Sequence, residues 1–167
     1  FEQLRENILK DGEVYEPICV WHGTIIDGHN RWRIIQENPE IPHRFKEMEF
    51  DDKWAAFEWM YRKQLGRRNL TDEQRTYMIG KMYEARKKSV GEHVGNQYTK
   101  MESPQNDDIP NGSAKTARTI AKELGVGQST VERSERFAKG VDTLRGESPE
   151  AADIVLRGKS GMSRSQV

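Results

Sequence analysis

The chain has 167 residues, of which 34% are hydrophobic and 32% are charged, so its cores must be small and its surface heavily ionised. Its mean hydropathy of −0.92 and the lack of an apolar run near about 18 residues exclude a membrane span. The single cysteine, Cys19, cannot form an internal disulfide, which fits a reducing cytoplasm. No signal peptide is visible, and we expect a fragment of a longer protein.

The formal charge of zero hides a segregation of the two signs along the chain. Residues 1–60 hold seven basic and thirteen acidic side chains, whereas residues 61–167 hold twenty basic and fourteen acidic ones. Within the second part, residues 62–100 carry ten basic side chains against four acidic ones. This asymmetry is typical of a protein with a polyanionic partner, but from charge alone a solvated helical face explains it equally well.

The first third of the chain predicts a small domain of mixed α and β structure. Two β-rich runs within residues 17–27 indicate a hairpin of two strands. A helix is expected over residues 29–37 and a third strand over residues 43–50. We therefore expect an α+β domain that ends at residue 66, followed by an all-helical domain over residues 67–167.

The second domain is predicted from helix signals in chain order. Thr71 and Gln74 are spaced as a capping box that opens a helix. Residues 91–114 are polar and lack periodicity, which indicates a linker. A compact helical segment is expected over residues 115–144, and Ser148 can cap a short helix after it.

The most specific signal is the segment 117–136, which has the spacing of a helix-turn-helix. Ala121 is the small residue that lets two helices cross closely, and Gly125, four residues later, tolerates the positive φ of a tight turn. An ordinary helical hairpin also needs glycine at its corner, but it does not explain this joint spacing. Ser134 stands where an aliphatic side chain is usual, and Phe137 is a candidate to replace it. The aliphatic residues expected in the small core are Ile120, Leu124, Val126 and Val131.

The second helix of this motif is expected to present its N-terminal residues to base edges in the major groove of double-stranded DNA. The candidates for this role are Gln128, Ser129, Thr130, Glu132 and Arg133. Three further cations are expected to meet phosphate, which positions a protein on DNA without specifying the sequence. They are Lys115, Arg118 and Arg136.

A second candidate site is the loop over residues 27–33, between a predicted strand and a predicted helix. Gly28 lets a ligand approach the backbone, and the free amides of a helix start attract anions. Arg31 adds a planar guanidinium suited to phosphate. A capped helix terminus facing solvent has the same local pattern, so the loop alone leaves both interpretations open.

The order of these motifs resembles that of the ParB family, which includes chromosome- and plasmid-partition proteins and nucleoid-occlusion factors. The resemblance rests on Pro17 to Val20, Asp27 to Arg33, Gln64 to Leu70 and the helix-turn-helix. It implies an N-terminal fold of the type that this family shares with sulfiredoxin. It also implies a cytoplasmic, nucleoid-associated protein that binds DNA and has a second copy of itself as a further partner.

The resemblance further implies a pocket for cytidine triphosphate or another nucleotide. The residues that correspond to its first motif are Pro17 and Ile18, and those that correspond to its second are Gly28, His29, Asn30 and Arg31, with Asn30 in place of an arginine. Arg67 corresponds to the arginine of the third motif.

The third motif departs from the pattern of the family. Its Glu-Asn pair helps to hold magnesium, but Arg62-Lys63-Gln64 occupies that region here, so magnesium finds no carboxylate and is not expected. We predict a pocket that binds a phosphorylated ligand and hydrolyses it poorly or not at all. Sulfiredoxin activity is excluded, because its cysteine belongs to the second motif whereas Cys19 lies on the preceding strand.

These patterns favour a ParB-like, sequence-specific DNA-binding protein in partition or transcriptional regulation, modulated by a nucleotide. The alternative from a different class is a nucleotide-dependent enzyme (a CTP or ATP hydrolase, a kinase or a nuclease) that uses the Gly28–Arg31 loop, and a carboxylate close to that loop would favour it. A third interpretation is a phosphate-sensing clamp without DNA specificity. No catalytic residue is predicted, and the histidines near Asp27 lack the paired spacing of a metal site.

Overall fold

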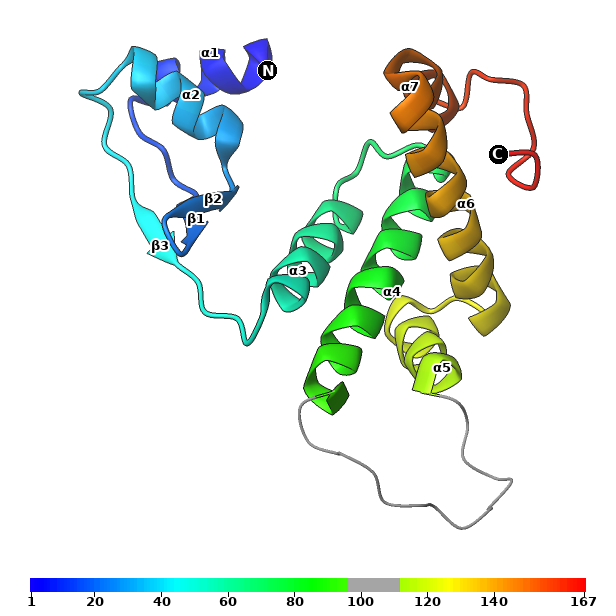
Figure 1. Ribbon diagram of the computed structural model, residues 1–167. Coiled ribbons are helices and arrows are strands. Elements are labelled where there is room, and N and C mark those ends of the chain that lie inside the picture. The colour runs from blue at the N-terminus through cyan, green and yellow to red at the C-terminus, as the bar shows by residue number, and fades with distance from the viewer. Residues whose placement is uncertain (96–111) are drawn as a thin grey trace, which may run out of the picture. The chain divides into compact units, whose positions relative to one another are not determined.

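The computed structural model describes residues 1–95 and 112–167, and the chain divides into two compact units, Phe1–Asp51 and Asp52–Val167 (Figure 1). The boundary that we expected at residue 66 therefore lies at residue 51 instead. The physical reason is that helix α3 (Lys53–Leu65) buries Leu65 in the core of the second unit. None of the helices in the described part of the chain combines the length and the apolar character that crossing a membrane requires.

The first unit is a small sheet with helices α1 (Glu2–Asp11) and α2 (His29–Glu37). Strand β1 (Ile18–Trp21) lies in the middle of the sheet, antiparallel to β2 (Thr24–Asp27) and parallel to β3 (Phe45–Glu47). Aliphatic side chains from both helices and from β1 form its core together with two residues of the connecting loops. They are Ile8, Val14, Ile18, Ile34, Ile35 and Ile41.

The turn between β1 and β2 explains why the predicted hairpin forms. His22 and Gly23 both have positive φ angles, 47° and 73°, as a two-residue turn with the twist of a hairpin requires. The structure also confirms the predicted helix over 29–37. The third strand is shorter than the expected 43–50, and all three of its residues are exposed.

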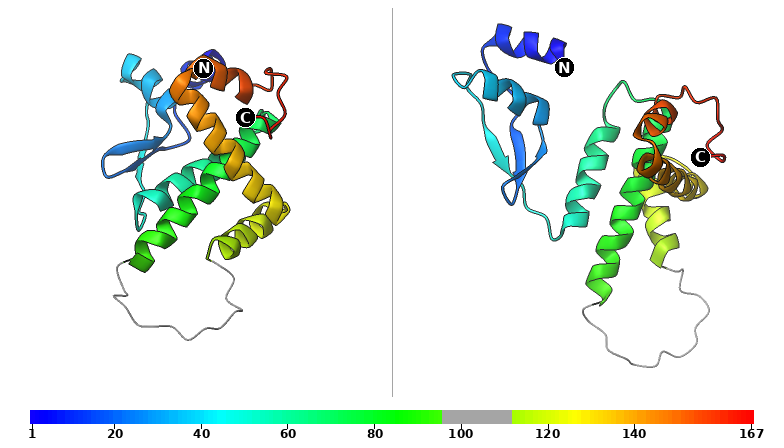
Figure 2. Two further views of the ribbon diagram at one scale, coloured as in Figure 1. Left: turned by 45° about the vertical axis from the view of Figure 1, so that its right-hand side comes forward. Right: turned by 45° about the horizontal axis from the view of Figure 1, so that its top comes forward.

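Helix α4 (Asp72–Gly95) is the central element of the second unit. It packs against α3 on one side and against α6 (Gln128–Glu147) on the other, as Figures 1 and 2 show. Helices α5 (Gly112–Leu124) and α7 (Pro149–Leu156) both pack against α6 and α4. The second unit is therefore all-helical, as predicted.

Local hydrogen bonds open α4 as the sequence predicts. The amide of Gln74 donates to Thr71 Oγ1, and the amide of Thr71 donates to Gln74 Oε1, each at 3.0 Å. Helix α4 continues to Gly95, past the expected start of the linker at residue 91. The rest of the expected linker up to Gly112, residues 96–111, lies outside the described residues.

Candidate nucleic-acid interface

A short turn over residues 125–127 joins α5 to α6. Gly125 has a φ of 66°, in the left-handed region. The amide of Val126 donates to the carbonyl of Ala121 at 3.0 Å, which satisfies one of the last carbonyls of α5. The carbonyl of Gly127 accepts from the amide of Thr130 at 3.0 Å as α6 begins. The break between the two helices thus lies where the sequence predicts it.

The apolar residues of the predicted motif belong to one buried cluster shared with α3 and α4. Ile120 and Val131 are fully buried, and Ala121 is nearly so. Leu124 and Val126 are partly buried and pack against the same cluster. Because a fully buried aliphatic side chain contributes about 1.5–3 kcal/mol, this packing holds α6 firmly against α4 and α5. The predicted core positions of the motif are confirmed.

Ser134 is the one position of the motif that departs from an aliphatic pattern. It is buried, and its hydroxyl donates to the carbonyl of Thr130 at 2.7 Å. Phe137 does not replace it, because Phe137 lies in a different cluster with Val141 and Val155. The expected substitution is therefore wrong. At this position α6 lies close to α4, because a Cβ on Gly80 would come within 2.1 Å of the Ser134 carbonyl oxygen.

The DNA-contact candidates lie on α5 and on the first part of α6. Two of them are half-buried and joined to each other, since Gln128 Nε2 donates to Glu132 Oε1 at 3.0 Å. Arg133 Nη2 donates to the hydroxyl of Ser129 at 3.2 Å. The exposed members of the set are Lys115, Arg118, Ser129, Thr130, Arg133 and Arg136.

The four cations among these candidates differ from the cations of α4. Lys115, Arg118, Arg133 and Arg136 form no ion pair with any residue that the structure describes. On α4, by contrast, the lysines and arginines other than Arg75 pair with carboxylates of the same unit. These paired cations are Lys81, Arg86, Lys87 and Lys88. Much of the positive charge in residues 62–100 is therefore neutralised internally, and the uncompensated cations on α5 and α6 can attract an anion.

Arg86 links three helices of the second unit. Its Nε donates to Glu58 of α3 at 2.9 Å, and its Nη1 donates to Glu123 of α5 at 3.1 Å. Arg62 of α3 also pairs with Glu123, at 2.7 Å. The hydrogen bond to Glu58 raises the pKa of Arg86, and the hydrogen bond from Arg86 lowers the pKa of Glu123. These ion pairs fix α5, which carries Lys115 and Arg118, to α3 and α4.

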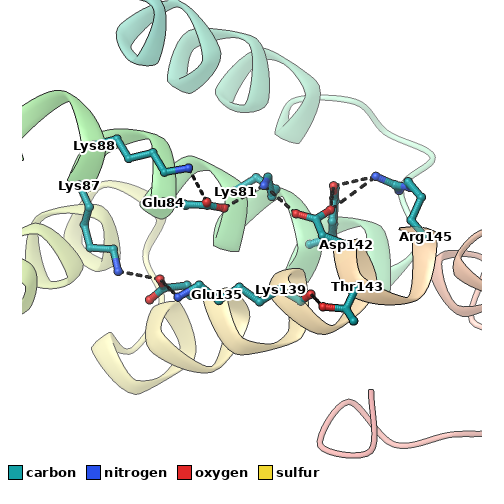
Figure 3. A network of polar contacts seen from close by, with 10 residues as sticks. Lys81, Glu84, Lys87, Lys88, Glu135, Lys139, Asp142, Thr143 and Arg145 are labelled. Carbon is teal, nitrogen blue, oxygen red and sulfur yellow. Dashed lines mark hydrogen bonds and ion pairs between the residues drawn. The ribbon is translucent and has the colours of Figure 1, made fainter. Parts of the chain in front are cut away.

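Figure 3 shows a second polar network, between α4 and α6. Lys81 Nζ donates to Asp142 at 2.7 Å and to Glu84 at 2.8 Å, and Lys87 pairs with Glu135 at 2.6 Å. Burial lowers the pKa of Lys81, but its bonds to Asp142 and Glu84 outweigh burial and raise that pKa above its ordinary value. The network therefore stabilises the charged form of Lys81 and holds α6 in register with α4.

The Gly28–Arg31 loop opens α2 in the first unit. Gly28 has a φ of 97°, and a Cβ there would lie 3.1 Å from Arg31 Nη2 and 3.2 Å from the Cα of Ile18. Glycine is thus required both for the conformation and for the close approach. His29 and Asn30 are exposed at the helix start. The predicted order of strand, glycine and helix N-terminus is present.

The guanidinium of Arg31 turns back onto acceptors of its own unit. Its Nη1 donates to Glu16 Oε2 at 2.5 Å, and its Nη2 donates to Asp27 Oδ2 at 2.7 Å and to the carbonyl of Pro17 at 3.3 Å. Its Nε is buried and donates to no described atom. Sequence reasoning missed the two carboxylates, and with them in place the contact of Arg31 with phosphate stays a prediction.

The other nucleotide-pocket candidates lie in separate parts of the chain. Ile18 is fully buried, so only its backbone is available to a ligand. Arg67 is exposed after α3, where it lines a depression of about 630 Å³ together with Arg68 and Asn69. It belongs to the second unit and the Gly28–Arg31 loop to the first, so their joint pocket stays a prediction. In the described segments, no cluster of three or more His, Cys, Asp or Glu side chains is placed to hold a metal.

Comparison with known proteins bears on the fold. No protein-family profile and no curated protein sequence matches the chain. A solved structure of a Pnob8-like ParB-N domain, in its C2221 crystal form, superposes with a TM-score of 0.54. The match covers 99% of this chain and 67% of that chain, at 19% sequence identity. The chain has the fold of a ParB-N domain. The expected fold class is therefore confirmed.

Proposed function

We propose that this protein binds double-stranded DNA through α5 and α6. It acts as a ParB-like protein in partition or transcriptional regulation. Its further partners are a nucleotide and a second copy of the chain. One observation carries the proposal. Two rigidly packed helices present exposed cations that no described carboxylate neutralises, among them Lys115, Arg118, Arg133 and Arg136. A fixed helix with a polar, cationic N-terminal part is what major-groove reading requires. The ParB-N-type fold is consistent with this role.

Arg133 and Gln128 are the candidates for base contacts, because arginine bonds bidentately to guanine and glutamine to adenine. In the free protein these side chains bond to Ser129 and Glu132, at 3.2 and 3.0 Å. DNA must replace these bonds with bonds to base edges. The exchange costs little, since a hydrogen bond in a partly exposed position contributes only about 0.5–1.5 kcal/mol net.

Selection of genomic fragments by the protein, followed by sequencing, tests the proposal. Arg133→Ala and Gln128→Ala should each weaken binding to the enriched site by about 1–3 kcal/mol, with little change on random DNA. Lys139→Ala is the matched control, because Lys139 is a cation of the same helix that pairs with Glu135 at 2.8 Å. Equal losses on both DNAs contradict base reading, and the absence of enrichment contradicts sequence-specific binding.

A second candidate function is nucleotide binding at the Gly28–Arg31 loop, which would modulate DNA binding. Arg31 Nε is a buried donor without an acceptor among the described residues, and a phosphate oxygen would supply one. Glu16 is 72% exposed, so its ion pair with Arg31 is weak enough for a phosphate to replace it. A nucleotide-dependent enzyme would also use the carboxylates of Glu16 and Asp27. Nucleotide binding and the release of phosphate must therefore both be measured, because only an enzyme would release phosphate.

A further inference from the structure

A groove of 920 Å³ runs along the side of α6 in the second unit. One wall is the face of α6 that carries Thr130, Arg133 and Phe137, and the other is the segment over residues 162–167. This segment is held close to α6, since a Cβ on Gly140 would come within 2.2 Å of the carbonyl oxygen of Val167. The groove thus adjoins the helix face for which we propose base contacts.

The side chains that line this groove suit an anion. They include the guanidinium groups of Arg133, Arg136 and Arg164, against one carboxylate, that of Glu73. Hydroxyl groups line it as well, from Thr76, Thr130, Ser163 and Ser165. Guanidinium and hydroxyl donors in one groove match the oxygen atoms of a phosphodiester.

Arg164 is held only loosely in the free protein. Its Nη2 lies 3.4 Å from Glu73 and 3.8 Å from Asp72, whereas the Lys81 and Lys87 pairs measure 2.6–2.8 Å. Its side chain is 47% exposed. A guanidinium with such long ion pairs loses little when it turns to another anion.

We propose that Arg164, with the hydroxyls of Ser163 and Ser165, binds the phosphate backbone of the same DNA duplex that α6 reads. The inference rests on the proposed function and adds a positioning contact outside α5 and α6. Such a contact strengthens binding to every sequence alike, because phosphates carry no base information. It also orients α6 along the duplex, since the 162–167 segment is packed against that helix.

The test measures binding of the full chain to the enriched duplex and to a random duplex over a salt series. Arg164→Ala should weaken both complexes by a similar factor, about threefold to tenfold at low salt, and reduce the slope of log K against log salt by about one. The ratio of the wild-type binding constant to that of the variant should then fall by a factor of about three to four between about 50 and 200 mM salt. Arg164→Gln should give the same slope change, and Arg164→Lys should keep the wild-type slope.

Arg157→Ala is the control, because Arg157 is an exposed cation that pairs with Asp153 at 2.7 Å outside the groove. An Arg164→Ala slope equal to that of Arg157→Ala overturns the inference. If Arg133→Ala still loses specific binding in that case, the proposed function stands. A loss confined to the enriched duplex also overturns the phosphate assignment. A wild-type protein that binds neither duplex overturns both the inference and the proposed function.

Discussion

Gly80 of α4 lies directly against the backbone of Ser134 of α6. A Cβ on Gly80 would come within 2.1 Å of the Ser134 carbonyl oxygen and within 2.8 Å of the Cβ of Ala138. The two helices therefore cross at backbone contact, which only small residues on both sides permit. This contact sets the position of α6. It therefore also sets the position of Arg133, which precedes Ser134 in the chain and belongs to the candidate interface.

Gly80→Ala should destabilise the second unit. Replacing an ordinary helical glycine by alanine stabilises a helix by about 0.5–1 kcal/mol, but here the added methyl meets backbone that cannot move aside. We expect a net loss of about 2–3 kcal/mol in the free energy of unfolding, measured by urea denaturation. Gly146→Ala on α6 is the control, because a Cβ there meets no described atom within 4 Å, and it should be neutral or stabilising. Equal effects of the two variants would contradict a tight crossing.

Arg86→Ala should also be costly, since it removes the less exposed of the two arginines that pair with both Glu58 and Glu123. The side chains of Arg86 and Glu58 are only 16% and 18% exposed, so the variant leaves a mostly buried carboxylate with the more exposed Arg62, at 2.9 Å, as its remaining cation. We expect a loss of about 2–3 kcal/mol on urea denaturation. Arg157→Ala breaks a pair whose two side chains are both more than half exposed and should cost less than about 1 kcal/mol. An Arg86→Ala loss as small as this would show that the cluster contributes little.

The acid sensitivity of the second unit should depend on Glu84. Burial raises the pKa of Glu84, but hydrogen bonds from Lys81 and Lys88 outweigh burial and bring it from 4.5 down to about 2. Because the folded state holds the charged form more strongly, this carboxylate stabilises the fold fully above its ordinary pKa. That stabilisation is lost as the pH falls from about 4.5 through about 2.

Glu84→Gln isolates this contribution, since every other carboxylate is the same in both proteins. The difference in unfolding free energy between wild type and Glu84→Gln should shrink by about 1–2 kcal/mol between about pH 7 and pH 3. Urea denaturation at the two pH values measures it. If the difference in unfolding free energy is the same at both pH values, Glu84 gains no stabilisation from its lysine partners.

Features set by a few neighbouring residues are the ones that the sequence predicts well. The capping box of Thr71 and Gln74 forms because each side chain bonds the amide of the other residue three positions away. Gly125 ends α5 because its own backbone can adopt a positive φ. Helix α1 was not predicted, although it has a comparable local signal: Leu4 and Ile8 are one turn apart, and Gly12 ends the helix with a φ of 67°.

Contacts between distant segments explain what sequence reasoning missed. Arg86 and Glu123 are 37 positions apart, and composition cannot tell such a paired cation from an unpaired one. For this reason the basic stretch over 62–100 looks like an anion-binding surface in the sequence, although most of the cations of α4 are neutralised within the fold. The domain boundary was misplaced for a similar reason, because Leu65 packs with residues of α4, α5 and α6.

The last prediction concerns Arg31, whose two carboxylate partners differ in exposure. Asp27 is 12% exposed and Glu16 is 72% exposed, so a phosphate is expected to replace Glu16 rather than Asp27. Glu16→Gln removes a competing negative charge and should strengthen the binding of nucleoside triphosphates about twofold to fivefold, as expected for an exposed ion pair of up to about 1 kcal/mol. Arg31→Ala should abolish most of this binding.

Titration calorimetry on the two variants measures this effect, and Lys10→Ala is the control. Lys10 is an exposed cation of the same unit and lies outside the loop over residues 27–33, so its loss should leave nucleotide affinity nearly unchanged. If all three variants bind like wild type, the loop is not the nucleotide site.

Released phosphate, assayed with magnesium, should stay near background. Phosphoryl transfer needs a metal to neutralise developing charge, and the region of Arg62 and Lys63 offers none of the expected carboxylates. Brisk magnesium-dependent release would instead favour the enzyme and would assign a role to Glu16 or Asp27 in holding the metal.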